Sequence, residues 1–250
     1  MIRNDLTDIL NGILKPELFN DLGPNGLQVA GRAKISKVLT AVSASVELFE
    51  RAVREKADTI IVHHGIIWNF ERPLYIGGYR ERVRLLLENN INLYGYHLPL
   101  DAHPEIGNNA RLCQLLGLGQ IEPFGDYNGQ YVGMRGEISS TDKKIFFDNV
   151  AATVEKKLMI FDYGPDNVQT VGIISGGAQK EIKQAVAAGL DVFISGEVSE
   201  HIMHYAKEEK IHFISAGHYA TEKFGVIALA ELLKMRWHLD AQFIDIPNPA

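Results

Sequence analysis

Short apolar runs alternate with amphipathic stretches along most of the chain. The apolar and β-branched runs predict strands, and apolar residues repeated at the helical period predict helices. The predicted strands cover 36–43, 58–63, 91–97, 130–139, 168–175, 190–195, 211–216 and 240–246. The predicted helices cover 3–14, 46–56, 78–90, 107–116, 141–156, 179–188, 199–209 and 219–235.

This alternation is typical of an α/β fold with mostly parallel sheets. The composition changes around "GQIEPFGDYNGQ" (119–130), where Gly and Pro flank the break. We therefore predict two similar α/β lobes, 1–125 and 126–250, that act as one functional unit. A shift of 133 positions aligns 38–64 with 171–197 without a gap, and each segment reads as strand, helix, strand. Either the lobes are related, or two βαβ units look alike because the same physics shapes both.

Composition narrows the classes of function. The 250 residues are 46% hydrophobic, which is enough for a large core, and the net charge of -6 disfavours a dedicated nucleic-acid binder. The single cysteine, Cys113, excludes an intrachain disulfide. The charged start "MIRNDLTDIL" does not resemble a signal peptide, and no apolar stretch is long enough to span a bilayer. We expect a cytoplasmic protein that has no membrane association.

Two adjacent histidines end the second predicted strand. Sites in open parallel sheets form beyond the carboxyl ends of the strands, so His63 and His64 lie where a site is expected. Neighbouring side chains on a regular strand point to opposite faces. Both rings can reach one site if the strand ends at Gly65, or if each ring binds a different ion. The alternative is one core histidine beside one exposed histidine.

The third predicted strand leads into "HLPLDAH". Asp101 follows His97 by four residues, and Pro99 between them argues for a loop rather than a regular helix. Such a loop can fold Asp101 back toward the site, or Asp101 can cap the helix that begins near Ile106. We predict that His103 lies on the surface.

The segment "GHYATE" opens the last predicted helix. His218 and Glu222 are four residues apart and therefore share one helix face, as two ligands of one ion or of a close pair of ions would. A pair on the helix surface with no further role is the alternative.

Together these segments offer three imidazoles and two carboxylates. This mixture suits Zn, Mn, Fe, Co or Ni better than Ca. Five side chains exceed the three that a catalytic mononuclear zinc normally uses, and they are too few to fill the coordination of two ions. A site for two divalent ions with open positions fits best, and such ions lower the pKa of bound water to about 7. The predicted ligands are His63, His64, Asp101, His218 and Glu222.

Several motifs resemble the Nif-three-like family, also known as GTP cyclohydrolase type 2 homologues. They are "PNGLQV", "VHHG", "GYHLPLDAHPEIGNNA", "SGEVSEH", "AGHYATE" and "FIDIPNPA", and the resemblance covers essentially the whole chain in its short bacterial form. It implies a Nif-three-like fold with a dinuclear metal site between two α/β lobes, and a ring-shaped homohexamer. The family's ligand positions fall on the same five residues. His97 also matches the pattern, and we interpret it as a general acid or base rather than a metal ligand.

Two classes of function follow. The first is a metal-dependent hydrolase in which His97 moves a proton, and the resemblance suggests ring opening of GTP or of a similar small molecule. The second is a metal carrier or insertase that uses the same ligands. A third possibility is a ring-shaped assembly through which nucleic acid passes. The hexamer implied by the resemblance favours this function, and the net charge of -6 disfavours it.

Two further positions have open interpretations. Gly176 and Gly177, between a predicted strand and a helix, form either a phosphate-binding loop or an ordinary turn. Glu197, which aligns with His64 under the shift of 133, faces the site or belongs to a surface contact.

Overall fold

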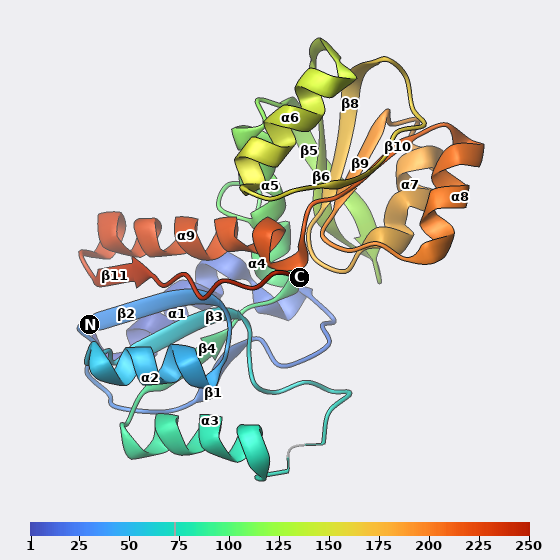
Figure 1. The fold of residues 1–250 in the computed structure, drawn as a ribbon. Coiled ribbons are helices and arrows are strands. Elements are labelled where there is room, and N and C mark those ends of the chain that lie inside the picture. The colour runs from blue at the N-terminus through green and yellow to red at the C-terminus, as the bar shows by residue number, and fades with distance from the viewer. Residues whose placement is uncertain (73) are drawn as a thin grey trace. The chain divides into compact units, whose positions relative to one another are not determined.

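The computed structural model describes residues 1–72 and 74–250. The chain forms two compact units, each drawn as a ribbon in Figure 1. Unit 1 comprises Met1–Leu100 and Val226–Ile246, and unit 2 comprises Asp101–Gly225 and Pro247–Ala250.

Unit 1 is built on a five-stranded sheet in the order β1-β4-β3-β2-β11. The β4–β3, β3–β2 and β2–β11 pairings are parallel, and β1 joins the edge antiparallel to β4. The elements are α1 (Arg3–Leu14), η1 (Pro16–Leu18), β1 (Gly26–Val29), β2 (Lys37–Ser43), α2 (Val46–Arg54), β3 (Thr59–His64), α3 (Gly77–Glu88), β4 (Asn92–Gly95) and β11 (Asp240–Phe243). Two helices contain the points where the chain passes between units: α4 (Leu98–Ala102) and α9 (His218–Trp237).

Alternate residues of β2 face opposite sides of this sheet. Leu39 and Ala41 belong to the core cluster that α2 and α3 cover. Thr40, between them, points the other way and donates a hydrogen bond from Oγ1 to the carbonyl of Val226 in α9 (2.8 Å). The alternation follows from the two-residue period of a strand. On the α2 side, Ser45 caps the helix by accepting from the Leu48 amide, which fixes where α2 begins.

Unit 2 is built on a six-stranded sheet in the order β5-β6-β8-β9-β10-β7. The β8–β9 and β9–β10 pairings are parallel, and the other three are antiparallel. The elements are α5 (Asn108–Leu115), β5 (Gly119–Tyr127), β6 (Gln130–Asp142), α6 (Lys143–Val154), β7 (Met159–Phe161), β8 (Asn167–Ile174), η2 (Gln179–Glu181), α7 (Ile182–Ala187), β9 (Val192–Ser195), α8 (Glu200–Glu209) and β10 (His212–Ser215).

Helices cover both faces of this sheet as well. The apolar residues of α5 and α6, among them Leu112 and Phe146, pack with inward residues of β8, β9 and β10 in one buried cluster. In Figure 1, α7 and α8 lie on the other side of these strands. The α/β prediction is therefore confirmed, and five of the nine pairings between described strands are parallel.

The segment 119–130 does not have the form that its composition suggested. Its residues form β5 and the turn at Asn128 and Gly129, and β5 pairs with β6 inside unit 2. Gly129 takes a positive φ of 84° in this turn, which explains the glycine without a lobe boundary. The compact units also differ from the predicted lobes: 101–125 belongs to unit 2, and 226–246 belongs to unit 1 because β11 pairs with β2.

The two segments that align under the shift of 133 share one hydrogen-bond pattern. Asp58 Oδ2 accepts from the backbone amides of Ser36 (2.6 Å) and Lys37 (2.7 Å). Asp191 Oδ2 accepts in the same way from the amides at 169 and 170, both at 2.9 Å. In both units the acceptor directly precedes the second strand and binds the two amides of the first strand region that align under the shift. The shared contact supports two related βαβ units over a chance likeness.

Among the described residues, no helix combines the length and apolar character needed to cross a membrane.

We predict that Asp58→Ala lowers the free energy of unfolding by about 3 kcal/mol, because it leaves two backbone amides without their charged acceptor. Urea denaturation would measure the loss. Asp8→Ala, at an exposed position of α1, is the matched control and should change stability by less than about 0.5 kcal/mol. Equal effects of the two changes would contradict a structural role for Asp58.

Candidate metal centre

Three histidines of unit 1 meet beyond the ends of β3 and β4. His63 and His64 are the last residues of β3, and His97 follows β4. The ring centroids are 4.6 Å apart for His63 and His64, 5.0 Å for His63 and His97, and 5.7 Å for His64 and His97. One nitrogen from each ring lies within 4.8 Å of the others, a spacing at which the three could hold a metal ion.

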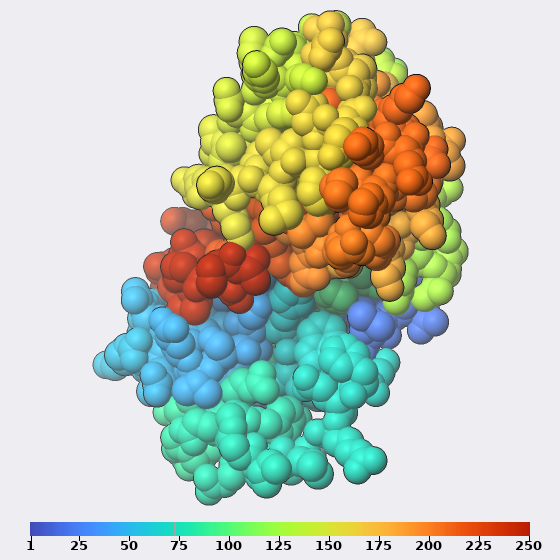
Figure 2. Space-filling view, turned by 45° about the vertical axis from the view of Figure 1, so that its right-hand side comes forward, coloured from blue at the N-terminus to red at the C-terminus, as the bar shows by residue number. Residues whose placement is uncertain are grey.

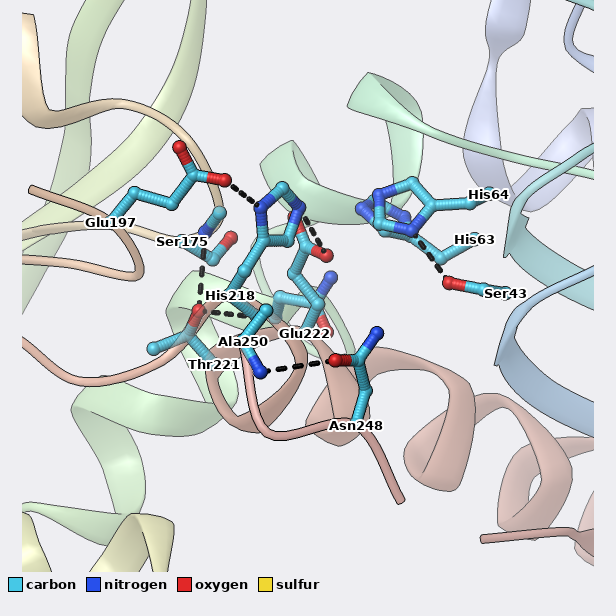
Figure 3. A network of polar contacts seen from close by, with 12 residues as sticks. Ser43, His63, His64, Ser175, Glu197, His218, Thr221, Glu222, Asn248 and Ala250 are labelled. Carbon is cyan, nitrogen blue, oxygen red and sulfur yellow. Dashed lines mark hydrogen bonds and ion pairs between the residues drawn. The ribbon is translucent and has the colours of Figure 1, made fainter. Parts of the chain in front are cut away.

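Each of the adjacent histidines is oriented through its Nδ1 atom. His63 Nδ1 lies 3.1 Å from the carbonyl oxygen of Tyr96, which can only accept, so Nδ1 carries the proton. His64 Nδ1 lies 2.9 Å from the Ser43 hydroxyl, which can accept as well as donate (Figure 3). The carbonyl contact fixes the tautomer of His63, and both contacts orient the rings so that Nε2 lies on the other side, as in histidines that bind metals.

His97 is held by a carboxylate that sequence reasoning missed. Asp21 Oδ1 lies 2.7 Å from His97 Nδ1, and its other oxygen accepts from the Leu98 amide (2.9 Å) and from Asn25 Nδ2 (2.8 Å). Asn25 in turn accepts from the His97 amide at 2.7 Å. Burial tends to raise the pKa of Asp21, but the hydrogen bonds from His97 and Asn25 outweigh it and lower the pKa below its ordinary value. Asp21 lies in a loop that has no hydrophobic periodicity. The only sequence feature that could have pointed to it was the nearby motif "PNGLQV".

Asp101 begins the donor group of unit 2. It is buried, and its Oδ1 accepts from Asn108 Nδ2 (2.8 Å) and from the Ser175 hydroxyl (3.0 Å). The cap of α5 is Gly107, so Asp101 does not have the capping role that the sequence left open. These contacts hold the carboxylate within 4.8 Å of a carboxylate oxygen of Glu222.

His218 and Glu222 occupy the first turn of α9 and face each other, as their spacing predicted. His218 Nε2 lies 3.1 Å from Glu222 Oε2, and His218 Nδ1 lies 2.8 Å from Glu197 Oε1 (Figure 3). Glu197, which follows β9, therefore faces the donor group rather than a separate surface. It orients His218 in the same way that Asp21 orients His97.

The charge state of His218 follows from these neighbours. Burial alone would lower its pKa, but the hydrogen bonds and charges of Glu222 and Glu197 raise the pKa to about 9. In the metal-free protein the ring is thus a cation at neutral pH. A metal ion that binds at Nε2 displaces that proton.

Gly176 gives the carboxylate of Glu222 its space. A Cβ atom at Gly176 would lie 2.2 Å from Glu222 Oε1, and its φ of 67° also favours glycine. A Cβ at Gly177 would lie 3.4 Å from Glu197 Oε2. Two carboxylates beside this loop repel a phosphate, so the loop is better explained as a turn that lets Glu222 approach.

Two expectations about "HLPLDAH" need correction. Residues 98–102 form the short helix α4 rather than a loop, because Pro99 lies in its first turn, where a proline breaks no helical hydrogen bond. His103 is half-buried rather than on the surface, and its Nδ1 accepts from the amides of Glu105 and Ile106, both at 3.2 Å.

The donor chemistry fits divalent transition metals. Unit 1 supplies imidazoles whose Nδ1 atoms are engaged with oxygen atoms, and unit 2 supplies an imidazole and two buried carboxylates. The carboxylates of Asp101 and Glu222 are buried close together, and a divalent cation bound there would offset their charge. The fold and these groups define an α/β protein with candidate metal-binding clusters.

A family model described as Duf34/NIF3 (NGG1p interacting factor 3) matches residues 1–249. The chain belongs to this family, and the resemblance predicted from the motifs is confirmed.

Similar proteins match over the whole chain. A relative from Salmonella typhimurium, named "GTP cyclohydrolase 1 type 2 homolog", is 46% identical and covers 100% of both chains. A solved structure from Thermus thermophilus, TTHA1606, has a TM-score of 0.92 at 34% identity, with 100% of both chains covered. Another, described as "protein ybgI, unknown function", has a TM-score of 0.94 at 44% identity and the same coverage.

We predict that the His218 ring in metal-free protein titrates near pH 9, which NMR of the imidazole nitrogens would measure. A raised pKa stabilises the fold fully below the ordinary value of about 6.5 and loses that effect as pH rises through 9. Glu222→Gln should lower the pKa by removing one ion pair. An unchanged titration in Glu222→Gln would contradict the pairing.

Proposed function

We propose that the protein is a metal-dependent hydrolase that uses two divalent transition-metal ions. The observation that carries the proposal is the convergence of three histidine nitrogens within 4.8 Å, with Tyr96, Ser43 and Asp21 engaging the Nδ1 atoms. We assign His63 and His64 as ligands and His97 as the acid or base beside them. A core histidine needs no such convergence. The proposed ligands are His63, His64, Asp101, His218 and Glu222, with zinc, iron, manganese, cobalt or nickel as candidate ions.

The support for these five ligands is chemical. The family match extends over all five residues, and imidazole and carboxylate donors complement each other around divalent transition ions.

When bound, the ions activate water and stabilise the negative charge that develops in hydrolysis. The residues of the chain supply the proton transfer. Asp21 holds the proton on His97 Nδ1 and fixes the ring, so Nε2 is the atom that accepts and returns a proton. Because the relatives are named as homologues of a GTP cyclohydrolase, a purine nucleotide such as GTP is the first substrate to test. The reaction to assay is hydrolytic opening of its ring.

The assembly and location implied by the resemblance remain proposals. We propose a homo-oligomer, a ring-shaped hexamer, that works in the cytoplasm on a small molecule and not on nucleic acid. Light scattering on the purified chain measures its mass in solution, and a monomer would contradict the ring.

We predict close to two transition ions per chain by elemental analysis of protein purified without an affinity tag or chelator. His64→Ala and Glu222→Gln each remove one proposed ligand, and each should lower the metal content. Glu200→Gln, at an exposed position of α8, is the matched control and should keep the full load. An unchanged metal content in either ligand variant would contradict the role of that residue.

We also predict that His97→Ala lowers kcat by about 10²- to 10⁴-fold, the usual contribution of a general acid or base, while the metal content stays the same. Asp21→Asn should lower kcat less and shift the pH profile, because it changes the orientation and charge environment of His97 without removing it. Nucleotide hydrolysis assays over a pH series measure both effects. Unchanged turnover in His97→Ala would contradict the proposed role of His97 in proton transfer.

The alternative function, metal delivery, has a separate test. Rapid transfer of metal from the protein to an apo-protein, without any turnover of nucleotide, would favour it.

A further inference from the structure

Gln28 lies at an irregularity in the edge strand of unit 1. The register of β1 against β4 shifts between Leu27 and Val29, so Gln28 is the extra residue of a β-bulge. A bulge points the extra side chain away from the direction that regular alternation would give it, and bulges are frequent beside functional sites. Here the Gln28 side chain, together with His63 and His97, lines a cavity of about 10 Å³, enough for about one water molecule.

Both ends of the Gln28 amide group are hydrogen-bonded to the backbone. Its Nε2 donates to the carbonyl of Pro24 (2.9 Å), and its Oε1 accepts from the Ile66 amide (2.8 Å). Because one partner can only accept and the other can only donate, the amide cannot be flipped without the loss of both bonds. Gln28 thus connects the loop 21–25, which precedes β1, with the loop that begins at Gly65 after β3.

Two glycines leave the space that the Gln28 amide occupies. A Cβ atom at Gly65 would lie 2.3 Å from Gln28 Oε1, and a Cβ atom at Gly95 would lie 2.8 Å from Gln28 Nε2. Neither glycine has a positive φ, so the close approach of Gln28 explains both better than the backbone conformation does. The amide is therefore held tightly against the ends of β3 and β4.

The two loops that this amide connects also contact each other directly. Asn69 donates from its backbone amide to the carbonyl of Leu22 (2.8 Å) and from its Nδ2 to the carbonyl of Asp21 (3.3 Å). In Figure 2 the surface of the N-terminal segment, in blue, lies beside that of the segment after β3, in turquoise. The segment after β3 therefore supports the loop 21–25 at two places, through Asn69 and through Gln28.

The supported loop is the one that holds His97. Asp21 contacts His97 Nδ1, and Asn25 accepts from the His97 amide. We propose that Gln28 is a positioning residue that fixes the loop 21–25 and, through it, the His97 ring. Its effect on catalysis rests on the proposed function. Its effect on the order of His97 rests only on the hydrogen bonds of unit 1.

Amide hydrogen exchange in the metal-free protein tests the order of His97. Gln28→Met keeps the length of the side chain but removes the donor and leaves only a weak acceptor. It should speed exchange at the amides of His97 and Leu98 about tenfold, because their acceptors lie on the released loop. The amide of Asn92, bonded to the Asp58 carbonyl at the other end of β4, should keep its rate.

Gln242→Met, at an exposed position of β11 in the same sheet, is the matched control and should leave all three exchange rates unchanged. Unchanged exchange at His97 and Leu98 in Gln28→Met would overturn the proposal. Equal acceleration at Asn92 would also overturn it, because Gln28 would then contribute only to general stability.

Kinetics of the metal-loaded protein test the effect on catalysis. Gln28→Met should lower kcat by about ten- to a hundredfold, the size of effect that a small displacement of a catalytic group can have. KM should not change, because the residue acts on a group that moves a proton. The metal content should also stay the same, since His63 and His64 keep their own Nδ1 contacts.

A second set of variants gives a test that does not depend on Gln28→Met. Gly65→Ala should displace the Gln28 amide and speed exchange at His97 and Leu98 in the same way. In the Gln28→Ala background the new methyl group has room, so Gly65→Ala should add little to the effect of Gln28→Ala alone. Additive effects of the two changes would overturn the role of Gln28, because Gly65 would then be required for another reason.

The outcome is separable from that of the proposed function. Faster exchange at His97 and Leu98 in Gln28→Met, together with no turnover by the metal-loaded parent protein, would keep the positioning role and reject the hydrolase. Turnover that Gln28→Met leaves unchanged would keep the hydrolase and reject the role of Gln28 in catalysis.

Discussion

The candidate site depends on the contacts that hold the Nδ1 atoms of its histidines. A histidine ring can rotate and exchange tautomers, so a cluster of imidazoles binds a metal well only if each ring is fixed beforehand. In unit 1 three different oxygen atoms do this: a backbone carbonyl at Tyr96, a hydroxyl at Ser43 and a carboxylate at Asp21. In unit 2, Glu197 does the same for His218. The sheets place the histidines at or just beyond the ends of strands, and the hydrogen bonds at their Nδ1 atoms orient the rings.

The sequence predicted most of the helices and strands, because these elements leave local patterns, and the proposed donors followed from their places at strand ends and on one helix face. Periodicity located the parallel strands and most helices, and the position of His63 and His64 at a strand end suggested a site before any geometry was known. The failures have physical reasons. The glycines and proline of β5 resembled a break between lobes, although antiparallel edge strands tolerate such residues. Pro99 led us to expect a loop where the short helix α4 forms. Proline destabilises the interior of a helix but not its first turn, where no helical hydrogen bond is lost.

The contact between Asp21 and His97 could not be predicted from hydrophobic periodicity, for a different reason. Asp21 lies in a loop, far from His97 in sequence, and only the folded chain shows that one carboxylate receives hydrogen bonds from His97, Leu98 and Asn25. The role of Glu197 could be suggested from the sequence, because the shift of 133 residues aligns Glu197 with His64. The shared role of Asp58 and Asp191 makes that alignment physically meaningful, since both hold the same point of a βαβ unit. The two units then differ at the ends of the second strands, where one carries an imidazole and the other a carboxylate.

The hydrogen bonds of Asp21 also couple the order of the N-terminal segment to the chemistry of a residue more than seventy positions away. Residues 21–25 have no sheet or long helix of their own, so the contacts with His97 and Leu98 are among the few that hold them. Local opening of this segment would release the His97 ring while His63 and His64 on β3 keep their own Nδ1 contacts. Amide exchange at Leu98 would then report on the competence of the site, and a homologous chain that lacks this segment would keep its metal donors but lose control over where its proton is held.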